Sequence, residues 1–302
     1  MRISSNGLFD ASVSRLNDLQ AKLDKLTQQV GSGKKLLNPS DDPLVASRTL
    51  ELNQSQAINQ QYTRNREFAK NTLGIVDGTL TGINDTLQSI NEQVIAAGSA
   101  TVSANDRAAI ANILKGQRDQ LLSLANTTDS AGNYLLTGTK TDHPAFTDNS
   151  GVISNYQGDA TQASIQVDNS RTLAASVTAD SLFGADAAFF TGLDAVITSL
   201  NDPATSTTDL QALLNTFSGQ FSTSFDHVTS AQVSVGIRLQ QLDEMDKSGT
   251  SRDAQFTQSL SALQDLDYNK ALSDLSRQQL VLQAAQKTFA QLSDMSLFNF
   301  LK

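Results

Sequence analysis

The chain has 302 residues, a formal net charge of −9, and neither Cys nor Trp. The excess of acid argues against nucleic-acid binding, which needs a basic face, and against binding to an anionic membrane surface. The absence of Cys excludes disulfides, thiol-based catalysis and Cys-ligated metals. Leu, Ile and Val are set at intervals in polar sequence with only four Pro, which favours long amphipathic helices over a compact enzyme core.

A heptad repeat occupies the first 30 residues. One apolar row recurs every seven positions and a second row follows three positions later: Phe9, Leu16, Leu23 and Val30, then Leu19 and Leu26. This period predicts a helix that packs against another helix. Gly31 and Gly33 end the pattern, and Pro39 and Pro43 predict a loop over residues 32–46.

A second helix is predicted to begin at Pro43, because Asp42 is a suitable N-cap and Pro is tolerated in the first turn. Two further heptad rows follow in this stretch: Leu73, Leu80, Leu87 and Val94, then Val76, Ile83 and Ile90. After a turn over residues 98–105, the pattern predicts a third helix that ends near Gly132.

The pattern changes over residues 133–180, where Tyr, Gly, Thr and Val become more frequent. Apolar and polar residues alternate on either side of a turn at 168–170: Ile165 and Val167, then Leu173, Ala175 and Val177. This alternation predicts a β-hairpin in a small β-rich region. A short helix over 192–200 is expected next, ending before Pro203.

The last third of the chain is again helical in pattern. We expect a helix over 208–245, an interruption at 247–251, and a long helix over 252–294. The last helix has a heptad row with two flanking residues that widen it: Tyr268, Leu275, Leu282 and Phe289, with Leu272 and Leu292. The chain closes on an unusually apolar stretch that contains Leu297, Phe298, Phe300 and Leu301.

These elements predict a mainly α fold with a β-rich insert, in which paired N- and C-terminal helices form a long antiparallel helical rod. The expected domains are a terminal coiled coil of residues 1–38 and 265–302, a helical bundle of 39–132 and 204–264, and a β-rich outer domain of 133–203. Two paired helices bury little core of their own, so we expect neighbouring copies to complete the terminal seams.

No catalytic, cofactor or metal site is predicted. His143 and His227 are far apart, and Asp41 and Asp42 precede Pro43 as capping residues do. No phosphate-binding, dinucleotide-binding or zinc-protease motif occurs. No apolar run is long enough for a membrane span, and none near Met1 reads as a secretory signal. The protein is therefore expected in the cytoplasm, or exported by a route without a cleaved signal.

Six stretches resemble the flagellin superfamily. In chain order they are MRISSN (1–6), SGKKLLNPSDDPLVA (32–46), GNYLLTGTKTDHPAF (132–146), NYQGDA (155–160), VGIRLQQLD (235–243) and SLFNFL (296–301). The Asp-Asp-Pro form of the second stretch, together with the last three stretches, is similar to the hook–filament junction branch, that of hook-associated protein 3.

The resemblance implies a non-enzymatic structural subunit of the bacterial flagellum, located outside the cell and exported unfolded by the flagellar type III apparatus. Its implied partners are further copies in an annular oligomer, hook-associated protein 1, flagellin, and an export chaperone that binds at Leu275, Leu282 and Phe289. The terminal helices would form the inner tube, with the β domain facing outward.

The expected assembly interface combines both terminal seams with the apolar chain end: Phe9, Leu16, Leu19, Leu23, Leu26, Val30, Leu272, Leu275, Leu282, Phe289, Leu292, Leu297, Phe298, Phe300 and Leu301. Three alternatives remain at this point. They are a flagellin-like filament subunit, a cytoplasmic coiled-coil scaffold, and an enzyme whose site leaves no local motif.

Overall fold

The computed structural model describes the backbone of residues 2–99, 102–149 and 151–298, and the side chains of these ranges except 2–6, 8 and 292–298. The chain divides into two compact units. We call residues 1–58 with 251–302 the terminal unit, and residues 59–250 the central unit. The predicted fold class, mainly α with a β-containing insert, is confirmed.

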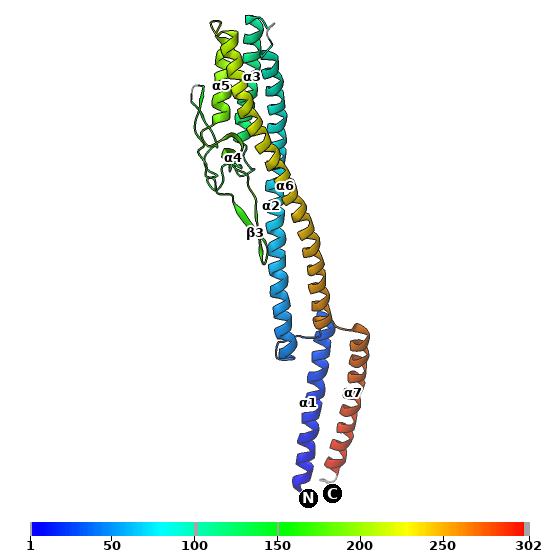
Figure 1. Cartoon of the computed structure of the whole chain (residues 1–302). Helices are drawn as coiled ribbons and strands as arrows, with labels where there is room; N and C mark the ends of the chain where they lie inside the picture. The colour runs from blue at the N-terminus through cyan, green and yellow to red at the C-terminus, as the bar shows by residue number, and fades with distance from the viewer. Residues whose placement is uncertain (1, 100–101, 150, 299–302) are drawn as a thin grey trace. The chain divides into compact units, whose positions relative to one another are not determined.

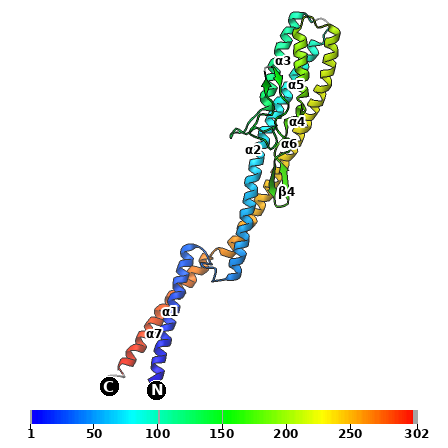
Figure 2. The same cartoon turned by 90° about the vertical axis from the view of Figure 1, so that its left-hand side faces the viewer.

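The terminal unit is built around two helices, α1 (Arg2–Ser32) and α7 (Tyr268–Phe298). They lie side by side and antiparallel, with the first turn of α1 and the last turn of α7 at the same end of the pair (Figure 1, Figure 2). The predicted pairing of the N- and C-terminal helices is therefore confirmed. The unit also contains the first turns of α2 (Pro43–Ala97) and the last turns of α6 (Thr207–Gln264).

Aspartates cap two of these helices. The Val45 backbone N–H donates to Asp42 Oδ1 at 3.1 Å, which confirms Asp42 as the N-cap of α2. The Lys270 N–H donates to Asp267 Oδ1, also at 3.1 Å. This second cap explains why the predicted continuous helix over 252–294 is wrong: α6 ends at Gln264, and a new helix begins after Asp267.

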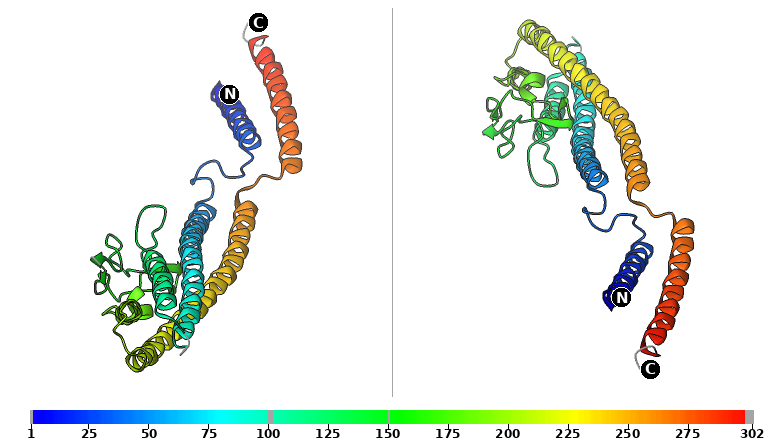
Figure 3. Two further views of the ribbon diagram at one scale, coloured as in Figure 1. Left: turned by 90° about the horizontal axis from the view of Figure 1, so that it is seen from above. Right: turned by 90° about the horizontal axis from the view of Figure 1, so that it is seen from below.

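The central unit groups α3 (Ala104–Ala125) and α5 (Ala188–Asn201) with the remaining lengths of α2 and α6, and Figure 3 shows this grouping from two further sides. Both predicted heptad rows of α2 face its core and are buried: Leu73, Val76, Leu80, Ile83, Leu87, Ile90 and Val94. Each fully buried side chain of this kind contributes about 1.5–3 kcal/mol. This unit therefore has a core of its own.

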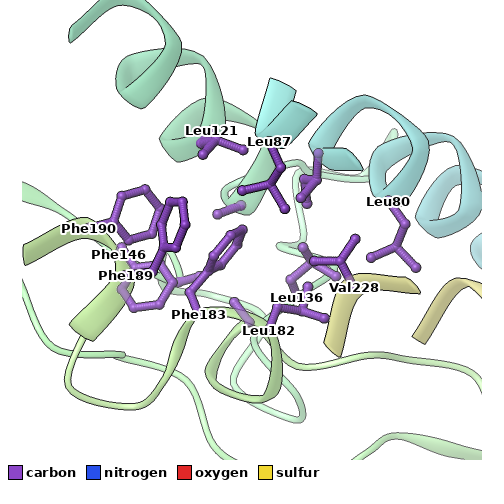
Figure 4. Close-up of a cluster of buried hydrophobic side chains, with 14 of the residues drawn as sticks. Leu80, Leu87, Leu121, Leu136, Phe146, Leu182, Phe183, Phe189, Phe190 and Val228 are labelled. Carbon is purple, nitrogen blue, oxygen red and sulfur yellow. The ribbon is translucent and has the colours of Figure 1, made fainter. Parts of the chain in front are cut away.

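Phenylalanines close one side of that core. Phe183, from the unpredicted short helix α4 (Ala179–Phe183), lies with its ring centroid 5.1 Å from that of Phe190. Phe146 lies 5.3 Å from Phe190 by the same measure. Figure 4 shows these rings grouped with Leu87 of α2 and Leu121 of α3. The aromatic residues of the insert thus anchor it to the helices.

The third helix ends at Ala125, earlier than the predicted end near Gly132. Asn126 follows it, and its side chain forms two hydrogen bonds with the backbone of Phe146. Its Nδ2 donates to the Phe146 carbonyl at 2.8 Å, and its Oδ1 accepts from the Phe146 N–H at 3.2 Å. These bonds take the chain out of the helix and toward the phenylalanine cluster.

The insert contains two antiparallel two-stranded sheets in the part of the chain that the structure describes. The first pairs β1 (Asp148–Asn149) with β2 (Val152–Ile153). The second, β3 (Ser164–Asp168) with β4 (Arg171–Ala174), is the predicted hairpin, with Ile165 opposite Leu173. The hairpin prediction is therefore confirmed.

Helix side chains hold this hairpin through its backbone. Asn65 Nδ2 donates to the Gln166 carbonyl at 2.7 Å, and Arg66 Nη1 donates to the Val167 carbonyl at 3.0 Å. From α6, Arg238 Nη1 donates to the Ala174 carbonyl at 3.2 Å. The hairpin is thus attached to both α2 and α6.

Arg66 is fully buried and also joins the two long helices. Its Nε lies 2.5 Å from Asp246 Oδ1, and its Nη2 donates to Thr63 Oγ1 at 2.9 Å. The guanidinium lies against Gly249 of α6, where any Cβ would collide with Nη2. The interruption predicted at 247–251 is wrong for this reason: Gly249 sits inside a continuous helix and makes room for Arg66.

Replacing Gly249 with Ala is expected to destabilise the central unit by about 1–3 kcal/mol, because the guanidinium must move away from Asp246 or from the hairpin. Chemical unfolding of the variant measures this loss. Gly236→Ala in the same helix is the matched control, because nothing lies within 4 Å of an added Cβ there. That control should stabilise by about 0.5–1 kcal/mol. Equal effects of the two substitutions would contradict the role given to Gly249.

Candidate assembly interface

The face that α1 turns toward α7 carries the predicted heptad rows. Its members are half-buried while the positions between them are mostly exposed: Leu16, Leu19, Leu23, Leu26 and Val30. The Phe9 ring centroid lies 5.1 Å from that of Phe289. Gln278 Nε2 donates to the Leu19 carbonyl at 3.3 Å. The structure therefore brings the two predicted seams together.

The seam is nevertheless shallow. Among the terminal-unit side chains that the structure describes, only Ala271 and Leu282 are buried, Leu282 with 7% of its surface exposed. Leu275 and Phe289 are half-buried, and half of Phe9 remains exposed. Two helices touch along one stripe, so each seam residue has solvent on its flanks. The described side chains of the terminal unit therefore form no enclosed core like that of the central unit.

The remaining predicted interface residues do not add to this seam in the described structure. About half of the Leu272 side chain, 48%, is exposed. Leu292, Leu297 and Phe298 lie in α7, but their side chains fall outside the described residues, as do Phe300 and Leu301 entirely. Their part in an interface stays a prediction.

Sequence reasoning missed a second apolar face on α7. Leu280 is 67% exposed and Val281 is 42% exposed. At 3.6 residues per turn, Leu280 points to the side of α7 away from Leu282. Neither residue falls in a heptad row, so the repeat did not reveal them. A count of apolar residues around the whole helix would have found this face. α7 therefore carries apolar side chains on the side that α1 does not cover.

The loop after α1 is fastened to the segment that precedes α7. The Lys35 N–H donates to the Gln264 carbonyl at 2.7 Å, and the Leu266 N–H donates to the Gly33 carbonyl at 3.0 Å. Gly33 has φ +69°, and an added Cβ would approach the Tyr268 hydroxyl to 2.8 Å. Only Gly fits this position readily. These bonds join α1 and α7 at the end of the pair away from the chain termini.

Asp41 orders the rest of the loop. Its Oδ1 lies 2.7 Å from Lys25 Nζ, and its Oδ2 accepts from the N–H groups of Asn38 and Leu37 at 3.2 and 3.3 Å. The hydrogen bond from Lys25, followed by that from the Asn38 backbone, lowers the pKa of Asp41 below its ordinary value of 3.8. Asp41 therefore holds the loop against α1.

This loop and the first turns of α2 enclose an open apolar groove of about 560 Å3. Leu36, Leu37, Pro39 and Pro43 line it, together with Leu50, which is 70% exposed. No pattern in the sequence predicted this groove. Most of its exposed lining is apolar, and Lys34 is the one titratable residue that lines it, so it suits packing rather than chemistry.

Among the residues that the structure describes, no group of three or more His, Asp or Glu is placed to hold a metal ion. No helix there is long and apolar enough to cross a membrane.

Known proteins resemble this chain along its full length. Residues 3–141 match the bacterial flagellin N-terminal helical region. Flagellar hook-associated protein 3 of Escherichia coli (strain K12) is 33% identical over 320 residues, which cover 100% of each chain.

Two solved structures share the fold. A putative flagellar hook-associated protein from Vibrio parahaemolyticus has a TM-score of 0.69 at 24% identity, over 74% of this chain and 100% of that one. The flagellar junction protein FlgL from Legionella pneumophila has a TM-score of 0.60 at 18% identity, over 74% of this chain and 100% of that one.

Acid is expected to release the loop over residues 33–42. The folded-state pKa of Asp41 lies below its unfolded-state pKa. The stability that the Asp41 carboxylate contributes is therefore complete above the unfolded-state pKa, and it is lost as the pH falls through the folded-state pKa. NMR titration of the Leu37 and Asn38 amides should therefore show a midpoint below pH 3.8. Asp41→Asn should remove this transition, whereas Asp18→Asn, on exposed α1 surface, should preserve it. A midpoint at or above the ordinary value would contradict the assignment.

Proposed function

The chain belongs to the flagellar hook-associated protein 3 family, and from this premise we propose that it is a non-enzymatic subunit forming the junction between hook-associated protein 1 and the flagellin filament. The observation that carries the proposal is the scarcity of buried side chains in the terminal unit, where only Ala271 and Leu282 are buried among those described. A subunit of this kind gains stability by packing against its neighbours.

On this proposal, the terminal seams are completed when the chain assembles with neighbouring copies. Neighbouring copies in an annulus cover the flanks of the α1–α7 pair and the second apolar face of α7 at Leu280 and Val281. Apolar area removed from water contributes about 25 cal/mol per Å2, which offsets the entropy lost on ordering. Copies that contact one another through unlike surfaces form a closed ring when a whole number of the rotations between adjacent copies makes a full turn.

On this proposal, each of the three predicted domains has its own place in the assembly. We assign the terminal coiled coil of residues 1–38 and 265–302 to the inner tube. The helical bundle of 39–132 and 204–264 surrounds that tube, and the insert of 133–203 faces outward. Support for the first assignment comes from the α1–α7 pairing, and support for the last from the attachment of the hairpin to one side of α2 and α6.

Export is the remaining part of the proposal. The chain passes unfolded through the flagellar type III apparatus to the outside of the cell, after an export chaperone has bound the C-terminal helix at Leu275, Leu282 and Phe289. These residues lie on one face of α7, as a helix-binding partner requires.

Replacing Leu282 with Asp is expected to abolish assembly while the central unit stays folded, because it places a charge in the seam and leaves the core of residues 59–250 untouched. Complementation of a deletion strain, with filaments counted by electron microscopy, measures assembly. Gln279→Asp adds the same charge at an exposed position of α7 and should leave filaments normal. Filaments of normal number and length with Leu282→Asp would refute packing along this seam.

Deleting the gene in the source bacterium tests the junction role. The expected phenotype is an intact hook without a filament, with flagellin shed into the medium. Normal filaments in the deletion strain would overturn the proposal. Long filaments built from the purified chain alone would instead identify a flagellin-like filament subunit.

A further inference from the structure

Residues of another kind interrupt two heptad rows that are otherwise apolar. On α2, Asn59 and Arg66 continue the row of Leu73 toward the start of the helix, and both are buried. On α6, buried residues seven apart form a comparable row: Val228, Val235, Leu242 and Gly249. Asn59 Nδ2 donates to the Gly249 carbonyl at 2.9 Å, and the Arg66 guanidinium also lies against Gly249. The three interruptions therefore coincide, and we call Asn59, Arg66 and Gly249 the register layer.

We propose that the register layer confines the α2–α6 pair to one alignment and excludes the alignments displaced by one heptad. The layer acts on the choice between alignments rather than on the strength of pairing. This inference concerns the structure of the central unit itself, so it does not rest on the proposed function.

α2 and α6 keep one antiparallel alignment over a long stretch of the central unit. Lys70 Nζ lies 2.6 Å from Asp243 Oδ1, and further along α2 the Thr81 Oγ1 accepts from Gln232 Nε2 at 3.0 Å. From the first contact to the second, α2 advances and α6 returns by the same number of residues. The alignment set at the register layer is therefore the alignment found beyond it.

The apolar rows alone do not select this alignment. Leu and Val recur every seven residues on both helices, so a slide of one heptad, about 10 Å along the axis, again sets apolar side chains against apolar side chains. No tight turn joins the two helices either, because α2 ends at Ala97 and α6 begins at Thr207. Contacts between exposed polar side chains contribute little to the choice.

The register layer distinguishes the alignments. One slide brings Arg66 to the level of Leu242, which lies one heptad before Gly249. The guanidinium then loses Asp246, its partner at 2.5 Å, and a buried charge without its partner is strongly destabilising. The opposite slide brings Leu73 to the level of Gly249, where the missing side chain leaves a gap. A buried polar position in an apolar row is a known means of fixing helix register.

The β3–β4 hairpin completes the hydrogen bonding of Arg66 in the native alignment. The pairing of β3 with β4 is irregular between Gln166 and Asp168, at Val167. A residue at such an irregularity is left out of the ladder, so its backbone groups are free for other partners. The Val167 carbonyl accepts from Arg66 Nη1 at 3.0 Å, and Thr63 Oγ1 accepts from Nη2 at 2.9 Å.

The first arm of the test makes the layer apolar. Asn59→Leu, Arg66→Leu and Gly249→Ala are combined in the full chain, which is unfolded in denaturant and refolded so that each molecule pairs its helices anew. Asp246 keeps a partner in this variant, because Lys70 Nζ lies 3.5 Å from its Oδ2. We expect the variant to fold, since apolar replacement of a buried ion pair is often neutral or stabilising.

The distance between two spin labels reports the alignment. The chain has no native Cys, so Gln61→Cys and Gln240→Cys, both at exposed positions, each carry one nitroxide label. Because Lys70 is level with Asp243, the labels sit at different heights along the pair, and a slide changes the distance between them. Pulsed EPR should give one distance with the native layer. The variant should add a second distance, which corresponds to a slide of about 10 Å.

Two further variants, with the same labels, separate alignment from stability. Arg66→Met removes the charge and keeps Asn59 and Gly249, and it should also give the second distance. Leu80→Ala weakens the fully buried apolar row of α2 but leaves the register layer intact. It should therefore keep the single native distance although it lowers the stability of the central unit.

Each outcome decides for or against the proposal. A single native distance in both layer variants would overturn it. Failure of both to regain helical circular dichroism would also overturn it, because the layer would then be needed for stability. So would a second distance with Leu80→Ala, since any weakening of the pair would then release the alignment. A second distance in a layer variant, with one distance in Leu80→Ala, supports the proposal.

Discussion

Two helices laid side by side can bury only the stripe along which they touch, and the terminal unit is governed by that limit. Leu282 reaches near-complete burial because it lies at the centre of the stripe, while Phe9 and Leu272 lie where solvent still reaches them. The central unit escapes the limit, because α3, α5 and the phenylalanines of the insert cover further sides of α2 and α6. One chain thus combines a part with its own core and a part whose described side chains mostly stay in contact with solvent.

The heptad rows could be predicted from the sequence because a seven-residue repeat places apolar side chains along one face of a helix. Spacing alone predicted Leu73 to Val94 as heptad rows of one helix, and the structure buries them in the core. It likewise predicted Leu16 to Leu26 as one side of a helix pair, where the structure leaves them half-buried. Helix ends were harder. Gly249 was predicted to interrupt the helix, but it lies inside α6 and leaves space for the Arg66 guanidinium. Arg66 is far from Gly249 in sequence, so no local pattern could show this contact. Asn126 likewise ends α3 through a bond to Phe146, which no local pattern reports.

The candidate interface was predictable to the extent that it follows a repeat. Leu280 and Val281 lie outside the heptad rows, so only the structure shows that α7 has apolar side chains away from α1. The groove beside Leu50 is a product of the loop that Asp41 orders. Its shape depends on hydrogen bonds to backbone groups, and such groups are the same in every sequence.

The β3–β4 hairpin is also held through backbone groups, which do not depend on the side chains of the hairpin. Asn65, Arg66 and Arg238 bond to its carbonyl oxygens, which every amino acid supplies. The outward side chains of the hairpin, such as Gln166 and Thr172, are exposed and leave those bonds unaffected when they change. The exposed side chains of the hairpin are therefore free to change in sequence while its attachment to the helices is kept.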